Sequence, residues 1–119
     1  MEDNKQYLLN KLIRLSNEGV HFPEVGKVTP SEITVINTQK ILDACDNNLL
    51  ENWDLALYVN GSVLLNYYKH NGIIAMVNIT ETGMSGIFSY LDVYIPVEVP
   101  INNPDKIIDI FNKTKEYNT

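Results

Sequence analysis

Leucines recur at helical spacing near the start of the chain. Leu8, Leu12 and Leu15 form one apolar stripe of the segment from Asn4 to Asn17. Gly19 follows this segment, where a residue in the left-handed conformation commonly ends a helix. The pattern therefore predicts a first helix over 4–17.

Residues 20–28 show no hydrophobic periodicity, so they are predicted to form a connecting loop. A second helix is predicted after this loop. Thr29 and Glu32 have the spacing of a capping box, and Pro30 suits the first helical position. The helix is expected to end near Asp46. Its predicted buried face consists of Ile33, Ile36, Ile41, Ala44 and Cys45.

From residue 53 the period changes to that of β-strands. β-Branched and aromatic residues occur in short runs between turn dipeptides, which is typical of an antiparallel meander. The predicted strands are Trp53–Val59, Val63–Lys69, Ile73–Thr80, Met84–Tyr90 and Asp92–Val99. Asn60-Gly61 favours a two-residue type I′ hairpin turn. Pro96 cannot donate a ladder hydrogen bond, so the last strand is expected at a sheet edge.

The chain closes with a third helical pattern. Asn103, Pro104 and Asp105 repeat a helix start signal, and Phe111 lies on the apolar face that follows. The order ααβββββα predicts one α+β domain over residues 1–119. It has two N-terminal helices, a five-stranded antiparallel meander sheet and a C-terminal helix.

Composition and charge exclude several classes of protein. The chain has 119 residues, of which 45% are hydrophobic, and its longest apolar runs are five residues, far short of the about 20 that a spanning helix needs. A net charge of −6 has the wrong sign for a protein that binds a phosphate backbone. Neither nucleic acid nor a membrane is therefore an expected partner. Cys45 is the single cysteine, which favours a reducing, cytoplasmic location.

The sequence offers no catalytic constellation. His21 and His70 lack a nucleophile or carboxylate at a suitable spacing, and Cys45 falls on an apolar helix face as an inert thiol. Neither metal-ligand spacing nor a glycine-rich phosphate motif occurs. Catalytic residues, metals and cofactors are therefore not expected, and an enzyme is not the favoured class.

Tyrosines are the candidate binding residues. Tyr58, Tyr67, Tyr90 and Tyr94 lie in or beside the predicted strands, and the type I′ register places Tyr58 and Tyr67 on one face with Val63. In one interpretation these rings line a solvated sheet face with their hydroxyls in water. In the other they form a partner surface, since tyrosine is enriched at interfaces.

Four segments carry a resemblance: Phe22 to Ser31, Trp53-Asp54, Leu57 to Leu65 and Phe88-Ser89-Tyr90. In this order they resemble a group of small bacterial α+β proteins, without an established function, whose genes often lie near phage or other mobile-element genes. A bacterial source also fits 15 asparagines and 13 isoleucines with Arg14 as the single arginine. The resemblance implies the fold and no catalytic residue.

Three hypotheses of function remain open. The first is a non-enzymatic interaction module whose acidic, tyrosine-bearing sheet binds a basic protein, as an antidote or an inhibitor does. The second is a small enzyme or ligand-binding protein with a site near His21. The third is a homodimer or larger homo-oligomer in which an open sheet face pairs with itself.

Overall fold

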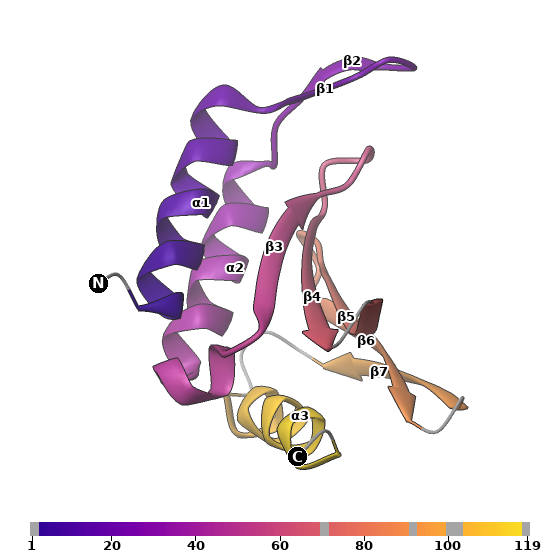
Figure 1. Cartoon of the computed structure of the whole chain (residues 1–119). Coiled ribbons are helices and arrows are strands. Elements are labelled where there is room, and N and C mark those ends of the chain that lie inside the picture. Colours follow the sequence, from indigo (N-terminus) through magenta and orange to yellow (C-terminus); the bar gives the residue numbers. More distant parts are fainter. Residues whose placement is uncertain (1–2, 70–71, 91–92, 100–103, 118–119) are drawn as a thin grey trace.

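The computed structural model describes residues 3–69, 72–90, 93–99 and 104–117. It has the predicted α+β class, with helices at both ends of the chain and antiparallel sheets between them (Figure 1). In chain order the elements are α1 (Asn4–Glu18), β1 (Val20–Phe22), β2 (Gly26–Val28), α2 (Glu32–Ala44), the 3₁₀ turn η1 (Asn47–Leu50), β3 (Trp53–Leu57), β4 (Val63–Lys69), β5 (Gly72–Ile79), β6 (Met84–Tyr90), β7 (Val93–Val99) and α3 (Pro104–Tyr117).

The main sheet is a meander with the strand order β3-β4-β5-β6-β7. Helices α1 and α2 lie side by side against β3, β4 and β5. Figure 1 shows the β1–β2 hairpin projecting from one end of this helix pair, and α3 near the other end. Among the described residues, no helix combines the length and the apolar character that a membrane span requires. Pro96 lies in the edge strand β7, as predicted.

The core lies between the helices and the inner face of the sheet. Trp53 packs edge-on against Tyr67, with ring centroids 5.2 Å apart, and against Phe111 of α3 at 4.6 Å. Each such buried side chain contributes about 1.5–3 kcal/mol relative to an exposed one. The other fully enclosed members of this core are Leu8, Leu12, Ile41, Leu42, Leu50, Leu55, Val63, Leu65, Val77 and Ile79.

Helix α1 confirms its sequence signals, but the segment after it does not. Gly19 has the positive φ of 70° expected of the cap. A Cβ at Gly19 would lie 2.6 Å from the carbonyl oxygen of Val28, because β2 returns directly beside the cap. The predicted loop over 20–28 is therefore wrong. It forms the β1–β2 hairpin, whose three-residue strands are too short to show a period in the sequence.

Helix α2 begins two residues later than predicted, and part of its predicted buried face is exposed. Its N-cap is Ser31, not Thr29, and the Thr34 amide donates to the Ser31 hydroxyl at 3.2 Å. Ile33 and Ile36, predicted to be buried, are 52% and 41% exposed. Ile41 and Cys45 are buried as predicted. The buried residues of α2 are Thr34, Asn37, Thr38, Ile41 and Leu42. Hydrogen bonds satisfy the polar members of this stripe, so apolar periodicity could not identify it.

The β3–β4 hairpin differs from the predicted type I′ turn by one residue. Leu57 pairs with Val63, the Gly61 amide donates to the carbonyl of Tyr58, and Gly61 alone in this loop has a positive φ, 89°. This is a three-residue loop that ends in a left-handed glycine. Since a one-residue shift reverses every face, Tyr67 points into the core with Val63, and its predicted shared face with Tyr58 is wrong.

Candidate functional site

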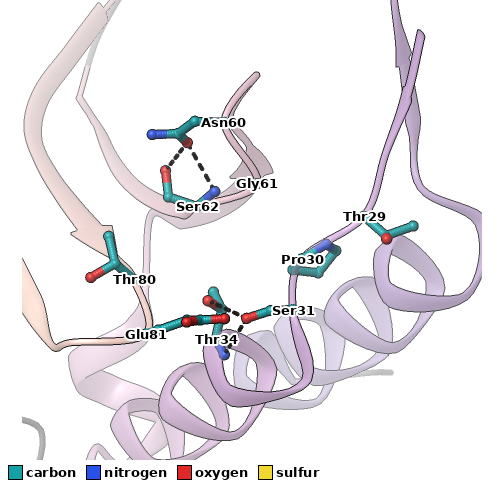
Figure 2. Close-up of a pocket in the computed structure, with 9 residues that line it drawn as sticks. All are labelled: Thr29, Pro30, Ser31, Thr34, Asn60, Gly61, Ser62, Thr80 and Glu81. Carbon is teal, nitrogen blue, oxygen red and sulfur yellow. Dashed lines mark hydrogen bonds between the residues drawn. The ribbon is translucent and has the colours of Figure 1, made fainter. Parts of the chain in front are cut away.

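A polar cavity of about 310 Å³ opens where the start of α2, the β3–β4 turn and the β5–β6 turn meet (Figure 2). The β1–β2 hairpin projects from the same end of the molecule, which we call the hairpin end (Figure 1). The residues that line the cavity are Thr29, Pro30, Ser31, Thr34, Asn60, Gly61, Ser62, Thr80 and Glu81. They come from three segments that are far apart in the sequence.

Local hydrogen bonds fix the β3–β4 wall. The side-chain oxygen of Asn60 accepts from the amide of Ser62 at 3.0 Å and from its hydroxyl at 2.7 Å. Gly61 approaches the chain before α2 so closely that a Cβ there would stand 3.5 Å from the carbonyl oxygen of Thr29. Asn60 and Gly61 thus set the turn against the neighbouring segment, as their turn chemistry favours.

A buried asparagine holds the β5–β6 wall. Asn37, in the middle of α2, donates to the carbonyl oxygens of Thr80 at 2.9 Å and Glu81 at 3.2 Å. The amide of Thr80 also donates to the carbonyl of Gly83 at 2.9 Å and closes the turn. The position of Glu81 at the cavity is therefore set by α2 as well as by its own hairpin.

The lining offers hydrogen bonds and one negative charge. Hydroxyls from Ser and Thr residues and one amide surround the opening, and Glu81 supplies the single ionisable side chain of the lining. Such groups can receive a polar or cationic group of a ligand. Among the described residues, no three His, Cys, Asp or Glu side chains gather where they could hold a metal ion.

Exposed apolar side chains lie in segments at the same end of the molecule as this cavity (Figure 1). Among the described residues, seven large hydrophobic side chains are exposed, and five of them lie in segments that meet at the hairpin end. Ile13 in α1 and Ile36 in α2 each lie within about two helical turns of the β1–β2 hairpin, counted along their own helix. The five are Ile13, Val25, Ile33, Ile36 and Tyr58, and 41–58% of each is exposed. We call these five the apolar rim.

The charges at the hairpin end are mainly negative. Four exposed acids lie in the same segments as the apolar rim, against the two exposed bases Arg14 and Lys27. The acids are Glu18, Glu24, Glu32 and Glu81. This end therefore shares the sign of the whole chain.

The predicted binding tyrosines do not form one surface. Tyr58 is 51% exposed and belongs to the apolar rim, whereas Tyr67 is 6% exposed in the core, so its predicted contact with a partner is incompatible with its position. Tyr90 ends β6, and Tyr94 pairs with Ser89 in β7. The side chains of these last two tyrosines lie outside the described part of the structure.

The histidine and cysteine candidates lie apart from the cavity. His21 is exposed in β1 opposite Lys27 and does not line it, while His70 is outside the described residues. Burial raises the pKa of the Cys45 thiol to about 12, because a thiolate is poorly stabilised among apolar neighbours. That environment agrees with the sequence prediction of an inert thiol.

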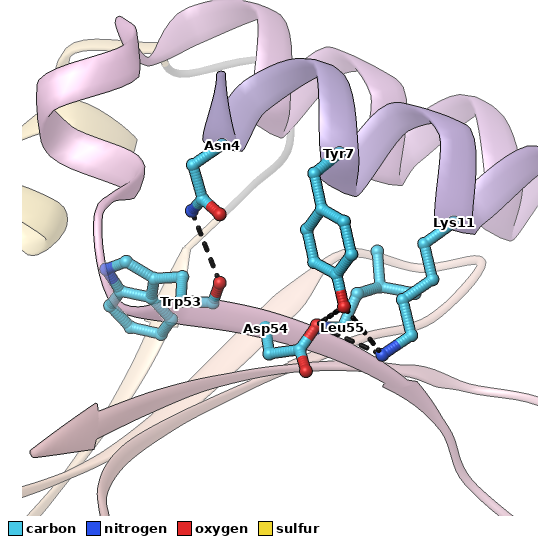
Figure 3. Close-up of polar contacts among 6 residues, drawn as sticks. All are labelled: Asn4, Tyr7, Lys11, Trp53, Asp54 and Leu55. Atoms are coloured by element: carbon cyan, nitrogen blue, oxygen red, sulfur yellow. Dashed lines mark hydrogen bonds and ion pairs between the residues drawn. The ribbon is translucent and has the colours of Figure 1, made fainter. Parts of the chain in front are cut away.

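A second polar cluster fastens α1 to the edge strand β3 (Figure 3). Lys11 lies 3.0 Å from the carboxylate of Asp54, to which the Tyr7 hydroxyl donates at 3.1 Å. Burial raises the pKa of Asp54, but hydrogen bonds from the Leu55 amide and Lys11 outweigh it and hold that pKa below its usual value. Asn4 donates to the carbonyl of Trp53 at 3.3 Å on the same side. This cluster has a structural role, because it ties two elements together.

No family model, curated protein or solved structure matches the chain. The resemblance to small mobile-element-associated bacterial proteins thus stays a prediction.

Proposed function

We propose that the chain is a non-enzymatic protein-binding module that holds a basic protein at the hairpin end, in the manner of an antidote or inhibitor. The observation that carries the proposal is the apolar rim at the same end of the molecule as a polar cavity (Figure 1). Single exposed hydrophobic residues need no explanation, but five of the seven that are exposed among the described residues lie at one end of the molecule beside polar groups, which is typical of a protein interface.

The apolar rim provides the affinity in this proposal. Ile33 and Ile36 lie on exposed positions of α2, and Val25 lies between the two short strands of the projecting hairpin. Full burial of one such side chain is worth about 1.5–3 kcal/mol. A few of these residues at the centre of an interface are enough to dominate its binding energy.

The negative charge of the hairpin end favours a basic partner. The chain carries −6, and exposed acids outnumber exposed bases at the hairpin end by four to two. A basic surface would be attracted over about 8–10 Å at physiological salt, which raises its association rate more than its final affinity. The cavity supports the same partner, since Glu81 and the surrounding hydroxyls accept hydrogen bonds from a lysine or arginine side chain.

The test is a capture experiment with matched variants. Immobilised wild-type protein, a V25S/I33S/I36S variant and a Y68S variant are each incubated with lysate of the source cells, and the retained proteins are identified. Tyr68 is a matched control because it is 43% exposed but lies at the opposite end of β4. We expect wild type and Y68S to retain the same basic protein, and the triple variant to lose it. Equal retention by all three would contradict the proposal.

A further inference from the structure

The β1–β2 hairpin projects from the body of the molecule beyond α1 and α2 (Figure 1). Its two strands pair over three residues each, and the turn between them consists of Pro23, Glu24 and Val25. All three turn residues are exposed, and we call them the tip. Val25, at 58%, is the most exposed large hydrophobic side chain among the described residues. The hairpin thus ends in an aliphatic side chain beside a carboxylate.

Packing holds the base of the hairpin in place. Val20 and Val28 are opposite each other where the hairpin begins, and both pack against the hydrophobic core. The end of α1 lies so close that a Cβ at Gly19 would stand 2.6 Å from the carbonyl oxygen of Val28. In the β3–β4 turn, a Cβ at Gly61 would stand 3.5 Å from the carbonyl oxygen of Thr29. These contacts fix the direction in which the hairpin projects.

The turn at the tip is itself constrained. The amide of Val25 donates to the carbonyl oxygen of Phe22 at 3.2 Å and closes a turn that has Pro23 at its second position. Proline fixes φ there, and β-turns favour it at this position. Gly26 follows with a φ of 82°, which few other residues adopt. The tip therefore loses little conformational freedom when it binds, which lowers the entropic cost of binding.

The shape of the partner decides how much of this tip is buried. On a flat surface the tip makes contact on one side only, and Val25 stays partly exposed. A concave site encloses the tip and removes Val25 and its surroundings from water, which is the environment in which single residues dominate a binding energy. Loops that stand out from a scaffold, such as the long loops of some antibody domains, bind concave sites in this manner.

We propose that the tip enters a concave site of the basic partner, in which Val25 fills an apolar pocket and the Glu24 carboxylate contacts a lysine or arginine beside that pocket. This inference rests on the proposed function and adds the shape of the partner's surface to it. Concave sites with an apolar lining and a few polar groups are typical ligand-binding or active sites. The chain therefore acts by occupying such a site and excluding the ligand that the partner binds there.

The charges of the hairpin place the partner's cation at the tip and not along the strands. Glu24 is the single ionisable residue of the turn. Lys27 and His21 are opposite each other farther along the strands, and both are exposed. A cation beside the strands would meet the like charge of Lys27, whereas a cation at the tip meets Glu24. Because Glu24 and Val25 are consecutive, that cation adjoins the apolar pocket.

Substitution of Val25 by tryptophan tests the pocket. The probe is the basic protein that wild type retains in the capture experiment, and isothermal titration calorimetry measures its dissociation constant. A pocket that fits valine rejects the larger ring, so V25W should weaken binding at least about tenfold. A flat contact would gain apolar area from tryptophan and bind equally or more tightly. Unchanged or tighter binding by V25W would therefore overturn the inference.

The matched control is I36W, because Ile36 is exposed in the same apolar rim but lies on the surface of α2. We expect I36W to bind within about threefold of wild type. Far-UV circular dichroism of both variants should match wild type, since both replaced side chains are exposed. Equal weakening by I36W and V25W would contradict insertion of the tip.

Glu24 provides a second measurement that does not depend on side-chain size. Loss of one partner of an enclosed charge pair acts mainly on the dissociation rate, whereas loss of a charge at the border of an interface acts on the association rate. In surface plasmon resonance with the same probe, E24Q should dissociate at least about tenfold faster. E32Q, at the exposed start of α2, should change only the association rate.

The failure of this inference differs from the failure of the proposed function. If E24Q changes the association rate alone, the partner binds the hairpin end without enclosing the tip, and only the inference is overturned. If the wild-type chain retains no protein in the capture experiment, the proposed function is overturned and the inference with it.

Discussion

The side-chain amide of Asn37 donates to the carbonyl oxygen of Thr80 at 2.9 Å. Asn37 is 8% exposed in the middle of α2, and Thr80 lies at the β5–β6 turn, 43 residues later. One hydrogen bond thus joins the helix that starts at the cavity to the turn that forms its opposite wall. The site depends on a polar residue inside the helix–sheet interface.

Replacement of Asn37 by alanine should lower the free energy of unfolding by about 1–3 kcal/mol, because two backbone carbonyls lose their donor in a buried place. Urea denaturation of N37A and wild type measures this difference. N17A, at an exposed position of α1, is the control and should change stability by less than about 0.5 kcal/mol. Equal effects of N37A and N17A would show that the bond contributes nothing.

Gly19 and Gly26 differ in surroundings but share a positive φ. G19A should destabilise the protein by more than about 2 kcal/mol, since its Cβ would meet the Val28 carbonyl at 2.6 Å in a strained conformation. G26A meets nothing within 4 Å and should cost only the conformational strain of about 1 kcal/mol. Thermal unfolding of the two variants gives the comparison. G26A as harmful as G19A would refute the described packing of the β1–β2 hairpin against the helix cap.

The pKa of Asp54 is lower in the folded chain, so its contribution to stability has a defined pH dependence. The carboxylate stabilises the fold above the unfolded pKa of about 3.9, and this stabilisation is lost as the pH falls through the folded pKa. The difference between wild type and D54N should therefore be present at pH 7 and disappear in acid. It should stay below about 1 kcal/mol, because the Asp54 side chain is 38% exposed and water screens its pair with Lys11.

Urea denaturation of wild type and D54N at a series of pH values measures that difference. K11M, which removes the ammonium of the same pair, should show the same disappearance in acid. A stability difference that grows as the pH falls would contradict the assigned interaction.

Asn66 should respond in the opposite direction to Asn37. Its side-chain oxygen is buried without a donor, so N66L should leave the unfolding free energy of the monomer unchanged or raise it by about 1 kcal/mol. Urea denaturation of N66L and wild type measures this effect. A loss of more than about 1 kcal/mol would indicate that Asn66 makes a stabilising interaction within the monomer.

Sequence patterns correctly predicted the elements in which the buried residues are apolar and recur at the period of the helix or strand. The leucine stripe of α1, the strands Val63–Lys69 and Met84–Tyr90, and the burial of Phe111 are all confirmed. The buried face of α2 was predicted wrongly because it contains Thr34, Asn37 and Thr38. Polar side chains are buried at low cost only when they are hydrogen bonded, here within the helix or to a distant turn. No local pattern reveals such partners.

The cavity and the apolar rim were missed for related physical reasons. The register of β3 and β4 depended on whether Asn60-Gly61 forms a two-residue or a three-residue loop, and both loops use a left-handed glycine. The spacing of Ser31 and Thr34 was the one local signal for the true N-cap. The corrected hairpin register places Tyr67 in the core, whereas Ile33 and Ile36 are exposed because α2 packs on the sheet through its polar stripe.

The central claim, that the hairpin end binds a basic protein, is tested most directly by surface plasmon resonance with the captured partner at a series of salt concentrations. We expect the association rate of wild type to fall steeply with salt, and that of an E24Q/E32Q/E81Q variant to be lower and nearly independent of salt. The V25S/I33S/I36S variant should dissociate at least about tenfold faster. Unchanged rates in both variants would contradict the claim.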